Sequence, residues 1–258
     1  MRTPIAWLNL WHKKVRLGVA IAGVAFADML IFMNLGFLGS VAETASMMYH
    51  KIDADIYLTS PRSLALSSSY AFPRKRLYQV AGIAGVERVM PFYIGYLMWR
   101  NPQTQLSRSI FVYGINPRDP VFLMPELQSP QHQAALNRWN TTLIDRQSRP
   151  EFGSLTTGTV TEAKRRQIEI GGQFSLGTSF SADGNLIMSD RNFRRYFTPR
   201  PLDRINLGLI KLKPNGDVNR TATAMRQILP PDVVVLTKQQ AIDRDRKFWI
   251  DTSSTGFI

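Results

Sequence analysis

The chain has 258 residues, no cysteine and a formal net charge of +13. Its length allows one or two domains, and the lack of cysteine excludes disulfide bonds and thiolate chemistry. The mean hydropathy of -0.14 excludes a protein made mostly of membrane spans. The basic balance could favour anionic lipid headgroups, acidic proteins or nucleic acid, although simple solubility is the plainer explanation.

The first elements in the chain predict a membrane attachment. Residues 4–14, PIAWLNLWHKK, predict a short helix in the cytoplasmic interface, with Trp7 and Trp11 at headgroup level. The stretch 17–38, LGVAIAGVAFADMLIFMNLGFL, is apolar on all sides of a helix. Such a helix would be about 33 Å long, enough to cross a hydrocarbon core of about 30 Å. The basic residues before Leu17 place the N-terminus in the cytoplasm and the rest of the chain on the other side.

Residues 17–38 have two alternative interpretations besides a transmembrane helix. A cleaved signal peptide would use the weak cleavage site Ser40-Val41-Ala42, but its apolar core would span only about 7–15 residues. A buried core helix of a soluble protein would have no use for the basic flank. We therefore predict a membrane anchor.

The predicted anchor also carries features typical of a helix that packs against other helices. Gly23, Ala27 and Asn34 fall on one stripe at helical spacing, and small residues on such a stripe allow close helix packing. Asp28 lies near mid-membrane, where an ionisable group faces protein or water rather than lipid. These four residues are the helix-packing candidates, with an isolated anchor as the alternative.

A mixed α/β domain is expected after the anchor. The helix is expected to continue through GSVAETASMMYH beyond residue 38. Alternation, β-branched content and turn residues predict strands at 54–59, 86–89, 92–99, 109–115, 141–144, 166–176, 185–188, 205–212 and 233–236. Helices are predicted at 74–81, at 190–197 capped by Ser189 or Asp190, at 217–229 capped by Asp217, and at 238–250 capped by Thr237. The four prolines of residues 116–130 predict a long loop, and Gly171-Gly172 predicts a β-bulge.

The sequence contains no pattern that argues for an enzyme. It has no P-loop, no G-x-G-x-x-G after a strand and no G-x-S-x-G. His12, His50 and His132 have no second histidine or carboxylate at metal-ligand spacing. Asp53 and Asp55 are interpreted as solvated carboxylates on a strand edge. No catalytic residue, metal site or cofactor is predicted.

The chain contains the blocks FSLGTSFSADGNLIMSDRNF, GLIKLKPNGDV, VVVLTKQQAI, AFADMLIFMNLGF, SRSIFVYGINPRDPVF and DRQSRPEFG. These blocks resemble the DevC family, permease subunits of cyanobacterial ABC exporters of the MacB/FtsX type. The resemblance covers essentially the whole chain. It implies a permease with four spans and a large periplasmic MacB-like domain after the first. A separate ABC ATPase subunit would supply energy, and a periplasmic adaptor would dock on the domain. The archetype is linked to glycolipid export.

The resemblance completes the predicted organisation. It consists of a cytoplasmic interfacial helix (1–16), transmembrane helix 1 (17–38), a periplasmic MacB-like core domain (39–245) and a helix leading toward a second span (246–258). The chain would thus be membrane-anchored α+β in an inner membrane. It ends at Ile258 where the family's second span would begin, so a fragment, a truncated product or half of a split subunit is expected. The expected partners are the ATPase, the adaptor, membrane lipid and a second permease copy, and not nucleic acid. The alternative function is a stand-alone, signal-anchored periplasmic binding or adaptor module.

Overall fold

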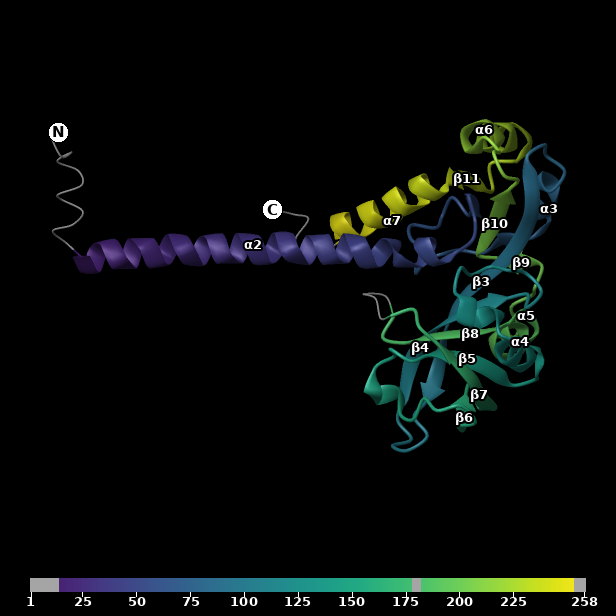
Figure 1. Cartoon of the computed structure of the whole chain (residues 1–258), viewed down its shortest axis with the longest axis horizontal. Coiled ribbons are helices and arrows are strands. Elements are labelled where there is room, and N and C mark those ends of the chain that lie inside the picture. The colour runs from purple at the N-terminus through teal and green to yellow at the C-terminus, as the bar shows by residue number, and fades with distance from the viewer. Residues whose placement is uncertain (1–13, 178–181, 253–258) are drawn as a thin grey trace.

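A computed structural model describes residues 14–177 and 182–252, and its most prominent element is helix α2 (Lys14–Lys51). Figure 1 shows α2 extending far beyond the folded domain, which lies at its C-terminal end. By length and composition α2 is long and apolar enough to cross a membrane, and none of its most apolar window is buried. The core-helix alternative for 17–38 is therefore wrong, because this segment packs into no core of the described residues. The interfacial helix predicted for residues 4–14 lies almost wholly outside the described residues.

The remaining elements confirm a mixed α/β domain. In chain order they are β1 (Ile56–Thr59), β2 (Phe72–Pro73), α3 (Lys75–Val80), β3 (Val86–Arg100), β4 (Ser107–Ile115), η1 (Pro125–Gln128), α4 (Pro130–Asn137), β5 (Thr141–Asp145), η2 (Pro150–Phe152), β6 (Val160–Ala163), β7 (Arg166–Phe174), β8 (Asn185–Ser189), α5 (Asp190–Phe197), β9 (Arg204–Ile205), β10 (Leu207–Leu212), α6 (Val218–Ile228), β11 (Val234–Thr237) and α7 (Lys238–Thr252). Helix α2 runs without a break across residues 38 and 39, and α7 runs across residues 245 and 246.

One large sheet organises the domain, with the strand order β11-β1-β10-β3-β4-β8-β5-β7-β6. Strands β1, β3, β10 and β11 with helices α3 and α6 form an antiparallel βαββαβ unit. The elements from β4 to β9 are inserted between its second and third strands. Because Trp99 of β3 also bridges Ala163 of β6, the inserted strands curl into a closed barrel with β3.

The two faces of the sheet bury separate apolar cores. Helices α3 and α6 cover one face of the βαββαβ unit, where Leu77 and Met225 are fully buried. The end of α2 and the start of α7 cover the opposite face, where Tyr49 and Ile242 are buried. Because α2 and α7 form one wall of the second core, they are structural parts of the domain as well as its connections to the rest of the chain.

Local signals for caps and for the bulge are confirmed. Ser189 accepts a hydrogen bond from the amide of Asn192, and Asp217 accepts one from the amide of Arg220. The register between β5 and β7 shifts beside Gly171, as the Gly-Gly pair predicted. A Cβ atom at Gly171 would come within 2.7 Å of the Cβ atom of Ala135, so side chains of neighbouring elements pack directly on the bulge.

One local prediction is wrong, and some short elements were not predicted. The strands predicted at 86–89 and 92–99 are one strand, β3, which continues through Pro91. Proline is tolerated there because β4 pairs with β3 only from Phe92 onwards, which leaves one edge of the strand free at Pro91. Helix α4 and strand β6 were not predicted. Each is short, and α4 begins directly after the proline-rich segment that indicated a loop.

Candidate functional site: the helix pair and its junction with the domain

Helices α2 and α7 form an antiparallel pair where the chain enters and leaves the domain. In Figure 1, α7 turns back from β11 and lies along the C-terminal half of α2. The contact begins near Val41 of α2, which is buried, whereas the preceding part of α2 is exposed. Arg246 of α7 donates a hydrogen bond to the hydroxyl of Ser46, at 3.4 Å. Both ends of the domain are thus joined to this pair of helices. We call α2 and α7 together the stalk.

Asp245 of α7 is the buried carboxylate at the centre of this pair, with 3% of its surface exposed. Its two oxygens accept the amide N–H of Leu66, at 3.2 and 3.0 Å. The hydroxyl of Tyr49 on α2 also donates to it. Burial raises the pKa of Asp245 to about 7, against the lowering effect of these donors and of Arg244. Asp245 therefore joins α2, α7 and the loop after β1 through a group that titrates near neutral pH.

The cavity beside Asp245 is small, with a volume of about 40 Å³. It is lined by residues of both helices and of the sheet, among them Met47, Trp249 and Tyr113. A space of this size holds a few water molecules and is far below the size of pockets for drug-sized ligands. The cavity beside Asp245 is therefore too small to serve as a substrate pocket.

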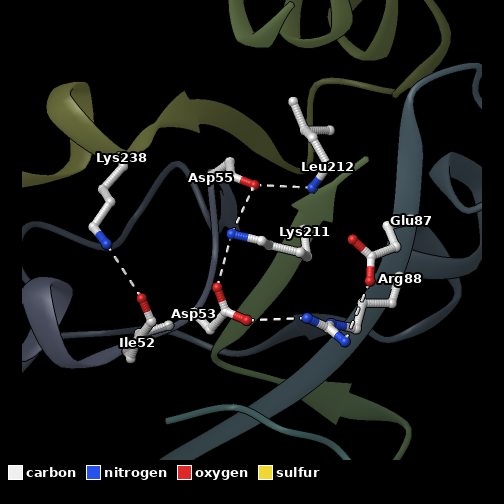
Figure 2. A network of polar contacts seen from close by, with 8 residues as sticks. All are labelled: Ile52, Asp53, Asp55, Glu87, Arg88, Lys211, Leu212 and Lys238. Carbon is white, nitrogen blue, oxygen red and sulfur yellow. Dashed lines mark hydrogen bonds and ion pairs between the residues drawn. The ribbon is translucent and has the colours of Figure 1, made fainter. Parts of the chain in front are cut away.

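A network of charged side chains joins the stalk to the sheet, and Figure 2 shows it at close range. Lys211 of β10 lies between two carboxylates, 2.8 Å from Asp53 and 3.5 Å from Asp55. Arg88 of β3 pairs with the second oxygen of Asp53 at 3.0 Å. The hydrogen bond with Asp53 raises the pKa of Lys211, so the ammonium form is stabilised there. We call Asp53, Asp55, Arg88, Lys211 and Lys238 the junction network.

Lys238 connects this network to α7. Its ammonium group donates to the carbonyl oxygen of Ile52 at 3.2 Å, and its backbone N–H donates to the carbonyl oxygen of Asp55. Burial lowers the pKa of Lys238. Since Ile52 directly follows α2 and Lys238 begins α7, the end of one helix and the start of the other are tied to β1 at the same point.

The sequence interpretation of Asp53 and Asp55 as solvated is wrong. Only 17% of the Asp53 side chain and 30% of the Asp55 side chain are exposed, and both are ion-paired. Their partner Lys211 lies more than 150 residues later in the chain, so no local pattern could reveal the pairing. The one signal in the sequence was Lys211, a lysine at an inward position of the apolar strand β10, which needs a buried acidic partner.

Two sequence blocks that carry the family resemblance meet in the barrel. The carboxylate of Asp145 is fully buried and accepts hydrogen bonds from the amide N–H of Gly177, at 2.8 Å, and from the side chain of Asn185, at 3.1 Å. Arg149 pairs with Asp183 at 3.0 Å. The block 145–153 and the block 174–193 therefore stabilise each other. The polar residues Asp145, Arg149, Asp183 and Asn185 have a structural role in this contact.

The predicted helix-packing residues lie on the part of α2 that extends from the domain. Gly23, Ala27 and Asp28 are exposed and Asn34 is partly buried. Among residues 14–177 and 182–252, no atom lies within 4 Å of a Cβ atom placed on Gly23. The packing of this stripe against another helix remains a prediction. Within the same ranges, no group of three or more histidine or acidic side chains could hold a metal ion.

The chain is similar to several solved structures of transporter domains. No protein-family model and no curated protein matches the chain. Solved structures similar to it include the extracellular domain of the noncanonic ABC-type transporter YknZ from Gram-positive bacteria, with 12% identity over 71% of this chain and 98% of that chain and a TM-score of 0.46. Another is the periplasmic region of MacB from Actinobacillus actinomycetemcomitans, with 10% identity over 79% and 95% and a TM-score of 0.49. A third is a domain of a putative permease protein from Porphyromonas gingivalis, with 14% identity over 73% and 89% and a TM-score of 0.41. At TM-scores of 0.41 to 0.49, these likenesses do not place the chain in a family.

Proposed function

We propose that this chain is a permease subunit of a tripartite ABC exporter, or the N-terminal part of one. The observation that supports it best is the antiparallel pair of α2 and α7 (Figure 1). A domain whose entry and exit helices run side by side is suited to insertion between two membrane spans. The sequence resemblance to DevC-type permeases supports the same assignment. In this proposal α2 spans the inner membrane, the N-terminus is cytoplasmic and the domain is periplasmic.

The domain would transmit movement rather than catalyse a reaction. A shift of α2 or α7 at the membrane would reach β1 through Lys238 and β10 through Lys211, because the junction network links both helices to these strands. A separate ATPase subunit would drive the shift, and a periplasmic adaptor would receive it. A glycolipid or another hydrophobic compound would be the exported substrate, and a second permease copy would complete the assembly. The proposal needs no cofactor and no nucleic acid.

The topology is tested by fusing reporters after Ile258. Alkaline phosphatase, which is active only in the periplasm, is expected to be active there, and a reporter that fluoresces only in the cytoplasm is expected to be dark. The opposite pattern would overturn both the topology and the exporter assignment.

The assembly is tested by purifying the tagged chain from its native host in a mild detergent. Mass spectrometry is expected to find an ABC ATPase subunit and an adaptor protein bound to it. Recovery of the chain without either subunit, but with correct topology, would instead favour the stand-alone anchored module.

The variant Asp28→Leu tests the role of the stalk in that assembly. A mid-membrane aspartate costs about 2.5–3.5 kcal/mol on insertion scales, so its removal is expected to leave insertion intact or improve it. If Asp28 faces another subunit, the same variant is expected to retain less ATPase subunit during purification. Val24→Leu, an exposed apolar position on the same helix, is the matched control. Unchanged copurification would show that Asp28 plays no part in packing.

A further inference from the structure

A second surface of the domain, far from the stalk, concentrates exposed cations around an exposed tryptophan. We define this cationic face by Trp139, Lys164, Arg165, Arg166, Arg191 and Arg195, all of which are exposed. The residues come from the loop after α4, the β6–β7 turn and α5. Figure 1 shows α4 and α5 on the side of the domain opposite to the projecting part of α2.

Side-chain contacts make the three segments one continuous surface. The guanidinium groups of Arg191 and Arg195 lie 5.8 and 5.9 Å from the ring centroid of Trp139. Lys164 lies 5.3 Å from the ring centroid of Phe197, at the end of α5. The hydroxyl of Tyr196 donates to the carbonyl oxygen of Gln167, which fixes α5 beside β7. The cations are therefore held near one another by packing and are not scattered.

The charge of this face is not neutralised within the described parts of the chain. None of its five cations takes part in an ion pair there. Two carboxylates at the border are engaged, since Glu169 pairs with Arg138 at 3.1 Å and Glu162 pairs with Arg100 at 3.0 Å, and a third, Asp190, precedes Arg191 in α5. The face thus has an excess of positive charge, and its border carries charges of both signs.

The β6–β7 turn shows that these cations carry a conformational cost. Lys164 and Arg165 both have positive φ values, +50° and +61°, in a two-residue hairpin turn. Such a turn favours Asn-Gly, since residues with larger side chains are strained at positive φ. Two adjacent cations also repel each other. The contact with Phe197 accounts for Lys164 within the fold, whereas the strained Arg165 is better explained by something it binds.

We propose that the cationic face is a docking site for an acidic segment of a partner protein. Arginine and tryptophan are enriched in protein interfaces, where arginine binds carboxylates through two parallel hydrogen bonds. Because Glu162 and Glu169 at the border are paired with Arg100 and Arg138, the free cations form a compact group, which suits a short acidic segment better than the extended phosphate backbone of a nucleic acid. A bilayer around α2 is at the opposite end of the molecule. The proposal does not depend on the chain being a permease.

The test uses the full chain in detergent micelles and a fluorescein-labelled poly-L-glutamate of about 20 residues, with binding followed by anisotropy. The informative variant is Lys164→Asn with Arg165→Gly, which introduces the preferred turn residues. It is expected to raise the melting temperature while weakening poly-L-glutamate binding by at least about fivefold. The matched control is Lys213→Asn with Arg220→Gln, which removes two exposed cations elsewhere and is expected to leave binding unchanged.

A second variant, Trp139→Ala, tests the aromatic centre and is expected to weaken binding while leaving the salt dependence unchanged. Absence of poly-L-glutamate binding, or equal loss in the control, would overturn the proposal. So would equal or tighter binding of single-stranded DNA or of anionic lipid vesicles, lost in the same turn variant, because the face would then recognise another class of polyanion.

Discussion

Replacing Asp245 with asparagine is expected to stabilise the chain relative to the wild type, by an amount that increases with pH. Asparagine has nearly the same shape and can still accept the amide N–H of Leu66, but it cannot ionise. Burial between α2 and α7 raises the pKa of Asp245 from 3.8 to about 7. In the unfolded chain this carboxyl loses its proton near pH 4, whereas in the folded chain it keeps the proton until near neutrality.

The sign and the size of the effect follow from this difference. Between the two pKa values the folded state binds a proton that the unfolded state lacks, so the wild-type free energy of unfolding falls as the pH rises. Above about pH 7 the carboxyl is ionised in both states. The buried charge then costs about 4 kcal/mol, because the pKa in the folded chain is about 7 and that in the unfolded chain is 3.8. Asp245→Asn is therefore expected to match the wild type near pH 4 and to exceed its stability by up to about 4 kcal/mol near pH 8.

The measurement is urea unfolding of both proteins in detergent micelles at several pH values. Tryptophan fluorescence reports the transition, since Trp99 is fully buried. Asp243→Asn changes an exposed carboxylate of the same helix and is expected to alter stability by less than about 0.5 kcal/mol at any pH. An advantage of Asp245→Asn that is constant or decreases with rising pH would refute the assignment of a buried, proton-binding carboxyl.

Three further changes test other parts of the domain by the same unfolding measurement. Lys211→Met leaves the carboxylates of the junction network without their shared cation and is expected to cost about 1–3 kcal/mol at neutral pH; an unchanged stability would contradict the pairing. Asp145→Ala leaves buried donors such as the amide N–H of Gly177 unpaired and is expected to cost about 3 kcal/mol. Gly171→Ala is expected to cost about 1–3 kcal/mol because its Cβ atom would overlap the side chains packed on the bulge. Gly82→Ala, where a Cβ atom meets nothing within 4 Å, is expected to stay within about 0.5 kcal/mol, and equal costs at the two glycines would contradict the close approach.

Features that depend only on neighbouring residues can be predicted from the sequence. The length and apolarity of α2 follow from composition alone. The caps of α5 and α6 follow from Ser189 and Asp217, since a cap needs only one side chain and the next turn of backbone. The bulge at Gly171 follows from a Gly-Gly pair within a β pattern. In each case the physical cause lies within a few residues of its effect.

Features that depend on residues far apart in the chain are visible only in the tertiary structure. The pairing of Asp53 with Lys211 joins strands more than 150 residues apart, and the return of α7 along α2 depends on the whole domain between them. The continuity of β3 through Pro91 depends on where its neighbouring strand β4 ends, at Ile115 opposite Phe92. The cationic face gathers side chains from three segments that are far apart in the sequence. Because burial and charge pairing are set by packing between distant segments, the local sequence does not specify them.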